Sequence, residues 1–215
     1  MPCNCCEITD NAFSEAEARA ELRNYRRRGP MNQTKLILEA IRSLNLKNVD
    51  LLDIGGGIGA MHHELLADVA RAATHVDASS AYLKEAKTET ARRGYSERVN
   101  FIHADFTDVA HQVQAAEIVT LDRVVCCYPD FRRLLKAAAD HSQRALALTY
   151  PRETWYMRIA LKIANFFQGL RRDPFRVFLH PVSEMNALLE KEGFERVSRR
   201  HLFVWEMALY RRAAM

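Results

Sequence analysis

One short segment constrains the fold of this chain more than any other. The apolar run Leu51–Ile54, with an acid at Asp53, is followed by the three glycines Gly55–Gly57 and then by Gly59. Glycine accepts a positive φ and lets a ligand approach the backbone without a Cβ in the way. The pattern therefore predicts a buried strand, a tight turn and a helix start with free N–H groups. At the carboxyl edge of a parallel sheet, such a turn is typical of a nucleoside-cofactor site.

The turn alone does not identify the cofactor. Gly55, Gly57 and Ala60 fit the dinucleotide pattern G-x-G-x-x-A, and Asp77 lies at about the distance expected of a ribose-binding acid. Asp53 argues for a different ligand, because a carboxylate at the strand tip would repel a pyrophosphate but suits a cation. About fifty residues of helical pattern also precede the turn, whereas dinucleotide-binding domains often begin near their first strand.

Four segments, in order and correctly spaced, resemble the motifs of the class I S-adenosylmethionine-dependent methyltransferases. These segments are Asp53–Gly59, Thr74–Ser79, Ala104–Phe106 and Ile118–Asp130. The resemblance has motif-level detail over residues 49–150 and extends more loosely to residue 210. It is closest to the small-molecule branch, with a distant similarity to magnesium-protoporphyrin O-methyltransferase.

The resemblance implies a cofactor site along the carboxyl edge of the sheet. The methionine end would lie on the glycine backbone, Asp77 would take the ribose hydroxyls, and Asp105 and Phe106 would flank adenine. An N-terminal segment often closes over the cofactor in this family, which would place Tyr25 beside the sulfonium and Arg28 near the methionine carboxylate. The implied cofactor-binding residues are Tyr25, Arg28, Asp53, Gly55, Gly57, Asp77, Ala78, Asp105, Phe106 and Leu121.

The expected acceptor site lies beyond the fourth strand and near a later loop. Its candidate residues are Arg123, Cys126, Cys127, Tyr128, Tyr150 and His180, with Arg123 or Arg176 as an anion anchor. Tyr128 and His180 are also candidate general bases, although a carboxylate or thiolate acceptor needs no base. The favoured alternative for His180 is a loop histidine packed on proline, and for Tyr128 an amphipathic pocket wall.

Strand and helix patterns alternate through the middle of the chain, which predicts a parallel sheet covered on both faces. We expect a Rossmann-like, doubly wound, mostly parallel seven-stranded sheet with an antiparallel C-terminal strand and an N-terminal helical lid. Ser14 and Glu17 form a capping-box pattern for a helix that should end near Arg28, and Met61–Ala70 should be a helix behind the glycine turn. One domain is expected, divided into a cap (1–45), a cofactor-binding core (46–150), a substrate-side helical insertion (151–182) and a C-terminal helix with strands (183–215).

The segment Trp155–Phe167 is apolar on nearly every side, so we expect a buried helix that roofs a hydrophobic acceptor pocket. A dimer interface or a membrane-surface contact is the competing interpretation, because the basic pair Arg171 and Arg172 follows.

Cysteine and charge patterns bound the remaining possibilities. The chain has 215 residues and five cysteines, of which Cys5–Cys6 and Cys126–Cys127 are adjacent pairs, so a secreted disulfide framework is not expected. With no signal peptide and no membrane-spanning run, a cytoplasmic protein is predicted. Thiolates from both cysteine groups, Cys3 included, offer a soft-metal site, but ordinary thiols are favoured and no metal is assigned. Adjacent His62 and His63 should diverge, one toward the core and the other toward solvent.

A net charge of +4 makes a nucleic-acid partner conceivable but not favoured. The fourth-strand motif also lacks the N/D-P-P-Y/F sequence found in many enzymes that methylate exocyclic base nitrogens. We therefore predict S-adenosylmethionine-dependent methyl transfer to a small molecule, preferentially at oxygen, by a monomer or a homodimer. The alternatives are a nicotinamide-dependent oxidoreductase and a non-catalytic cofactor-binding protein.

Overall fold

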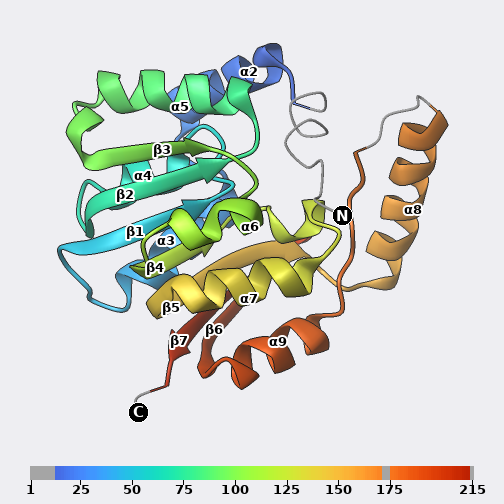
Figure 1. The fold of residues 1–215 in the computed structure, drawn as a ribbon. Coiled ribbons are helices and arrows are strands. Elements are labelled where there is room, and N and C mark those ends of the chain that lie inside the picture. The colour runs from blue at the N-terminus through green and yellow to red at the C-terminus, as the bar shows by residue number, and fades with distance from the viewer. Residues whose placement is uncertain (1–12, 171–174, 214–215) are drawn as a thin grey trace.

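The computed structural model describes residues 13–170 and 175–213, which form one layered α/β unit around a single sheet (Figure 1). The sheet has seven strands in the order β3-β2-β1-β4-β5-β7-β6. The strands are β1 (Val49–Ile54), β2 (Ala70–Asp77), β3 (Val99–His103), β4 (Ala116–Leu121), β5 (Ser142–Pro151), β6 (Phe194–His201) and β7 (Trp205–Arg212). The first five are parallel, and β7 pairs antiparallel with both β5 and β6, as the sequence predicted.

Helices cover both faces of the sheet (Figure 1). One hydrophobic core lies between β1, β4 and β5 and the helices α6, α7 and α9, and a second lies beneath α3 and α4. The helices are α2 (Glu15–Arg28), α3 (Asn32–Arg42), α4 (Ala60–Leu65), α5 (Ser80–Arg92), α6 (Phe106–Val109), α7 (Phe131–His141), α8 (Trp155–Leu170) and α9 (Val182–Lys191), with short turns η1 (Ser96–Arg98), η2 (Ala110–Gln112) and η3 (Val125–Cys127). Because the strand order reverses between β1 and β4, the carboxyl ends of these strands form the crevice where this architecture binds ligands.

The N-terminal helix α2 forms as its sequence predicts. The Ser14 side chain accepts a hydrogen bond from the Glu17 N–H, and the Glu17 side chain accepts one from the Ser14 N–H. The helix ends at Arg28 because Gly29 takes a φ of +74° and its N–H returns to the Tyr25 carbonyl. Its inner face packs Leu22 and Tyr25 against the glycine turn of the core.

One predicted boundary was wrong. The helix behind the glycine turn ends at Leu65 rather than at Ala70, and Ala70 already opens β2, where it pairs with Val49 of β1. The residues after Leu65 continue the apolar pattern of the helix, but they form the turn into β2. Two of them, Leu66 and Val69, are buried. Burial alone does not separate a helical turn from the start of a buried strand.

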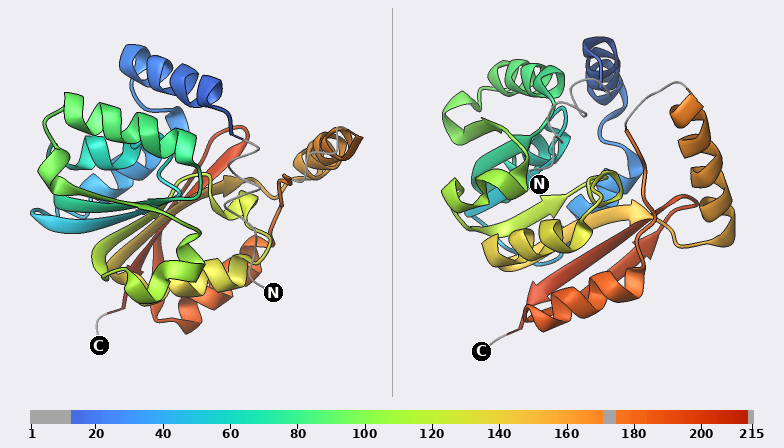
Figure 2. Two further views of the ribbon diagram at one scale, coloured as in Figure 1. Left: turned by 45° about the horizontal axis from the view of Figure 1, so that its top comes forward. Right: turned by 45° about the vertical axis from the view of Figure 1, so that its right-hand side comes forward.

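The prediction that the helix near residues 155–167 is buried was also wrong. Helix α8 stands away from the sheet, as the right-hand view of Figure 2 shows, and Met157 is its one buried residue. Trp155, Phe166 and Leu170 expose 73%, 67% and 73% of their surface. No helix among the described residues is both long enough and apolar enough to cross a membrane.

Candidate functional site

The glycine turn between β1 and α4 has the backbone geometry that its sequence requires. Gly55, Gly57 and Gly59 have φ values of +61°, +56° and +84°, a region that side chains with a Cβ rarely occupy. The Gly55 N–H donates to the carbonyl of Val76, and the Gly57 N–H donates to Asp77 Oδ2 at 2.8 Å. The turn is therefore tied to the end of β2.

Asp77 is held between this turn and the start of α5. Its Oδ1 accepts the N–H of Ser79 at 2.8 Å, and its side chain is buried. Burial raises the pKa of Asp77 to about 6, although the N–H groups of Ser79 and Gly57 favour the charged form. Further donors that reach this carboxylate, such as the hydroxyls of a ribose, would find it already oriented. Ala78 follows it, and its carbonyl contacts the His103 ring.

Gly56, the middle glycine, has a different role. It is not among the residues with positive φ, but a Cβ on it would lie 2.6 Å from Asp53 Oδ2 and from His75 Nδ1. Glycine is needed here because the backbone passes directly over buried polar side chains. A Cβ on Gly55 would meet the Val124 side chain at 2.5 Å, so the turn is closely packed on that side as well.

Asp53 belongs to a buried polar cluster that the sequence analysis missed. Its Oδ1 accepts the Thr120 hydroxyl at 2.8 Å, and its Oδ2 lies 3.2 Å from His62 Nδ1, which is itself 3.2 Å from His75 Nδ1. Burial raises the pKa of Asp53 and lowers the pKa of both histidines, so the rings are neutral. The prediction that one of His62 and His63 faces solvent was wrong, because both are fully buried and both contact Thr90.

The same cluster is the described group that could hold a metal ion. The ligand atoms of Asp53, His62 and His75 all lie within 4.8 Å of one another, and two imidazoles with a carboxylate are a donor set that zinc accepts. The backbone of Gly56 occupies the space beside these atoms, which leaves little room for a fourth ligand. We interpret the cluster as a hydrogen-bonded support that orients Asp53 below the turn.

A cavity of about 600 Å³ opens beside the glycine turn. Residues of α2 and α3, the turn itself, the residues after β4 and the loop between β6 and β7 line it. The lining includes Glu21, Tyr25, Arg28, Met31, Thr34, Asp53, Gly55, Gly57, Asp122, Arg123, Phe203 and Trp205. The structure thus brings together the predicted residues from the N-terminal segment, the turn and the fourth strand.

Arg123 and Asp122 form the charged side of this cavity. Arg123 has a φ of +63°, its N–H donates to Thr149 Oγ1, and its guanidinium donates to Glu21 of α2 at 2.7 Å. Asp122 accepts hydroxyl hydrogen bonds from Thr34 and Thr149, and burial raises its pKa. Asp122 lies within the fourth-strand segment Ile118–Asp130 but was not predicted as a site residue. Its position directly after a strand end was the available signal.

Asp105 caps α6 and holds Tyr128. Its carboxylate accepts the Thr107 N–H at 2.9 Å and the Tyr128 hydroxyl at 3.0 Å. Burial raises the pKa of Tyr128 to about 12. Phe106 is 3% exposed and packs in the core against the ring of His141, and Leu121 is fully buried in the same core. These residues lie near the end of the sheet but do not line the 600 Å³ cavity.

The adjacent cysteines Cys126 and Cys127 belong to η3, and His180 contacts the backbone of this turn. His180 Nε2 is 3.1 Å from the carbonyl oxygen of Val125 and 3.0 Å from that of Tyr128, so this nitrogen carries a proton and donates to them. Cys126 and Cys127 have sulfur atoms 3.7 Å apart, and both contact the carbonyl of Arg123. The pKa of the Cys126 thiol is raised by its contact with the Cys127 thiol and by its own burial. Cys3, Cys5 and Cys6 lie outside the described residues.

Two further predicted site residues, Tyr150 and Arg28, lie in different surroundings. Tyr150 is buried in the core, where its hydroxyl donates to Glu206 at 2.8 Å. Arg28 is exposed at the rim of the cavity. The structure therefore does not bring Tyr150, His180 and the cysteine pair into the cavity that contains the glycine turn.

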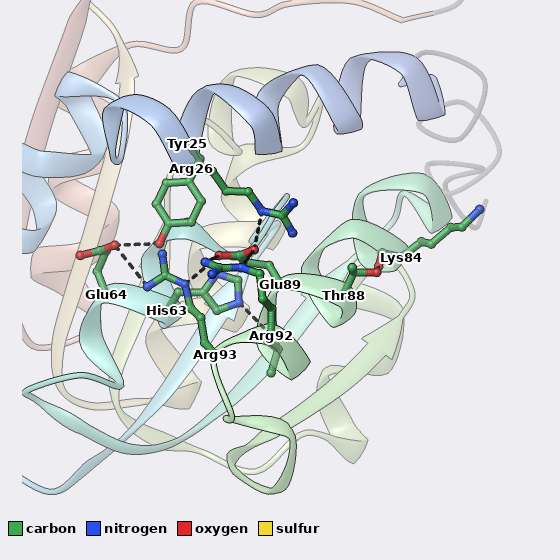
Figure 3. A network of polar contacts seen from close by, with 10 residues as sticks. Tyr25, Arg26, His63, Glu64, Lys84, Thr88, Glu89, Arg92 and Arg93 are labelled. Atoms are coloured by element: carbon green, nitrogen blue, oxygen red, sulfur yellow. Dashed lines mark hydrogen bonds and ion pairs between the residues drawn. The ribbon is translucent and has the colours of Figure 1, made fainter.

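A network of polar contacts joins helix α2 to residues of α4, of α5 and of the α5 C-cap (Figure 3). The Tyr25 hydroxyl donates to Glu64 at 2.7 Å, and its ring stacks on His63. Arg26 donates at 2.8 Å to Glu89, a fully buried carboxylate that also binds Arg92 and Arg93 of α5 and its C-cap. The network positions Tyr25 and neighbouring α2 residues along the cavity wall.

Stability should depend on the ionisation of Glu89. Its burial opposes the charge, but hydrogen bonds from three arginines lower its pKa from 4.5 to about 2. A depressed folded pKa contributes stability above the unfolded pKa, so this contribution is lost as pH falls from about 5 toward 2. We expect Glu89→Gln to lower the free energy of unfolding at neutral pH by about 2 kcal/mol, a figure discounted because the arginines are part-exposed. The variant should also lose less stability than wild type between pH 7 and pH 3. Urea unfolding at the two pH values measures both effects, and an equal loss of stability in variant and wild type would contradict this role of Glu89.

Comparisons with known proteins agree with this geometry. Residues 51–144 match the model of a family described as a methyltransferase domain. No curated protein matches the sequence. The structure is similar to magnesium protoporphyrin IX methyltransferase from Synechocystis PCC 6803 with bound S-adenosylmethionine (16% identity, 98% of each chain covered, TM-score 0.70). It is also similar to an O-methyltransferase family protein from Burkholderia thailandensis (15% identity, 97% of this chain and 62% of that chain, TM-score 0.73) and to mitomycin 7-O-methyltransferase (20% identity, 77% and 49%, TM-score 0.58).

Proposed function

We propose, from the match of residues 51–144 to a methyltransferase-domain family, that the chain is an S-adenosylmethionine-dependent methyltransferase. On this proposal, it transfers the methyl group to an oxygen atom of a small, mostly apolar acceptor that carries an acidic group. The observation that carries the proposal is the composition of the 600 Å³ cavity. The glycine turn forms one wall, Met31, Phe203 and Trp205 form an apolar wall, and Arg123 supplies a cation. A cofactor on the turn and an acceptor against the apolar wall would meet in this space.

On this proposal, the cofactor occupies the turn and the neighbouring strand ends. Gly55 and Gly57 present backbone without a Cβ to the methionine end, and Asp77 accepts the ribose hydroxyls. Asp53 lines the cavity below the turn and adds negative charge near a sulfonium. Tyr25 and Arg28 contribute from α2, and Asp105, Phe106, Ala78 and Leu121 are assigned to the adenine side.

The cofactor supplies an activated methyl group, so the protein has mainly to align an acceptor oxygen with it. Arg123 is the proposed anchor for the acidic group of the acceptor, because it lines the cavity and its guanidinium already pairs there with the carboxylate of Glu21, which lines the same cavity. Tyr128 and His180 are less suited to act as a base, since the first donates to Asp105 and the second to backbone carbonyls. Asp122 lines the cavity and is the better-placed carboxylate to accept a proton from a hydroxyl acceptor.

Oxygen is favoured as the acceptor atom by the fourth-strand sequence and by the similar structures. Leu121–Val124 stands where many enzymes that methylate exocyclic base nitrogens have N/D-P-P-Y/F. Two of the three similar structures described above are named as O-methyltransferases. Incubation with S-adenosylmethionine that carries a labelled methyl group, against a panel of apolar carboxylic acids, phenols, amines and thiols, tests the proposal. We expect the labelled methyl group in methyl esters or ethers. A labelled methyl group found only on nitrogen or sulfur would overturn the proposal.

Replacement of the proposed anchor should affect the acceptor alone. We expect Arg123→Gln to raise KM for an acidic acceptor about 10- to 100-fold, since a charge-assisted hydrogen bond contributes about 1.5–3 kcal/mol. Affinity for S-adenosylhomocysteine should stay within about twofold of wild type. Arg132→Gln, an exposed arginine on α7, is the matched control. An unchanged KM in Arg123→Gln would remove Arg123 from the acceptor site.

A further inference from the structure

Helix α8 presents an apolar face to solvent. Its exposed members recur every three or four residues, a spacing that places them on one side of a helix. They are Trp155, Ile159, Ile163, Phe166, Phe167 and Leu170, each more than half exposed. A contiguous apolar surface of this kind on a globular protein marks an interaction site rather than ordinary surface variation.

Contacts on its other side fix this helix with the apolar face outward. Met157 is buried, and the amide of Asn165 forms two hydrogen bonds with the backbone of Val177, at 2.8 and 3.0 Å. At the N-terminal end, the Tyr156 ring stacks on Phe203 with centroids 5.4 Å apart, and its hydroxyl donates to the Phe203 carbonyl at 3.0 Å. These contacts orient the helix, and none of them involves the six exposed apolar residues.

The same contacts join the apolar face to the mouth of the cavity. Phe203 is 76% exposed and lies in the loop between β6 and β7, and Phe203 and Trp205 both line the 600 Å³ cavity. The exposed surface of α8 therefore continues through Tyr156 and Phe203 to the proposed acceptor wall. We call the outer face of α8, together with Phe203, the α8 surface.

Basic residues outnumber acidic ones along the α8 segment. From residue 153 to 173 the sequence has Arg158, Lys162, Arg171 and Arg172, with acids at the two ends, Glu153 and Asp173. Arg158 pairs with Glu153 at 2.7 Å, so the remaining excess is positive. A basic amphipathic helix with an aromatic residue at its end suits the interface of a bilayer with anionic lipids, where lysine and arginine reach the headgroups and apolar side chains enter the acyl boundary. A second copy of this chain would bring like charges together, which disfavours self-association through this face.

The length of α8 sets how deep it can lie. Its 16 residues span about 24 Å at about 1.5 Å per residue, less than the roughly 30 Å hydrocarbon core of a bilayer. The helix can therefore lie in the plane of the interface but cannot cross it.

We propose that the α8 surface docks on membranes that contain anionic lipids and holds the mouth of the cavity against the bilayer. An apolar acceptor dissolved in the lipid would then enter the cavity past Phe203 without crossing water. The docking stands on the surface itself, whereas the acceptor's route rests on the proposed function.

Vesicle co-sedimentation of the full chain tests the docking. Vesicles of phosphatidylcholine alone are compared with vesicles that also contain phosphatidylglycerol, at low and physiological salt. We expect binding to the anionic vesicles that weakens with salt, and a loss of about tenfold or more in affinity for Phe166→Asp and Ile163→Asp. Val197→Asp is the matched control, because Val197 is 39% exposed on β6, away from the α8 surface. This variant should bind as wild type does.

Three results would overturn the proposal. Wild-type protein could fail to bind anionic vesicles, or Phe166→Asp could bind them as well as wild type. Alternatively, light scattering could show a dimer that Phe166→Asp converts to a folded monomer, which would make the α8 surface an interface between copies. Affinity for S-adenosylhomocysteine, measured in solution without lipid, separates the two proposals. If wild-type protein binds anionic vesicles but does not bind S-adenosylhomocysteine, the proposed function is contradicted and the docking proposal still holds.

Discussion

Asp77→Ala should weaken the binding of S-adenosylhomocysteine by at least about 100-fold. The proposed ribose site loses two charge-assisted hydrogen bonds, each contributing about 1.5–3 kcal/mol, and about 1.4 kcal/mol corresponds to tenfold in affinity. The substitution also frees the N–H groups of Gly57 and Ser79, which Asp77 binds at 2.8 Å, so the glycine turn loses its tie to β2. Isothermal titration calorimetry measures the affinity directly.

Two companion variants separate binding from folding. Asp77→Asn keeps an acceptor oxygen and most of the shape, so it should bind more tightly than Asp77→Ala but less tightly than wild type. Asp108→Ala removes an exposed acid that pairs with Arg133 and should leave the affinity unchanged. If Asp77→Ala is folded by circular dichroism and binds with wild-type affinity, Asp77 is not the ribose-binding acid.

Gly56→Ala should destabilise the fold by about 1–3 kcal/mol, the range typical of an extra methyl group in a packed core. The new Cβ would lie 2.6 Å from Asp53 Oδ2 and from His75 Nδ1. Both side chains are fully buried. Asp53 contacts His62 and Thr120, and His75 contacts His62, so neither can move away without breaking the cluster. For a chain of this size, a melting temperature lower by several degrees is expected, at about 2–4 °C per kcal/mol.

Gly169→Ala is the matched control for this substitution. Gly169 lies in α8, where a Cβ would meet its nearest neighbour, the Arg176 side chain, at 3.5 Å, an ordinary contact. Alanine has the higher helix propensity, so this variant should be neutral or slightly stabilising. Equal melting temperatures for Gly56→Ala and wild type would show that the backbone does not need glycine above Asp53.

The parts of the fold that local sequence determines were predicted well. The capping box of Ser14 and Glu17, the end of α2 before Gly29, and the positive φ of Gly55 and Gly57 each depend on residues close together in the chain. The mostly parallel sheet was predicted from the alternation of strand and helix patterns, each of which is a local signal. These features share a physical cause, namely short-range backbone geometry.

The parts that depend on long-range contact were not predicted. His75 meets Asp53 and His62 because β2 pairs beside β1, and nothing in the local pattern of His75 marks it as polar core. Tyr128 was placed near the site by its position after β4, but its orientation toward Asp105 depends on α6. For α8, the apolar composition led to the prediction of a buried helix, but composition does not say whether another part of the chain covers it.

We expect above all that the glycine turn of this chain binds the methyl-donor cofactor. Calorimetric titration of the wild-type protein with S-adenosylmethionine, S-adenosylhomocysteine, NAD and NADP tests it most directly. The account predicts saturable binding of S-adenosylmethionine and S-adenosylhomocysteine at one site per chain, with no heat of binding from NAD or NADP. Binding of NAD or NADP in the absence of any binding of S-adenosylhomocysteine would contradict it.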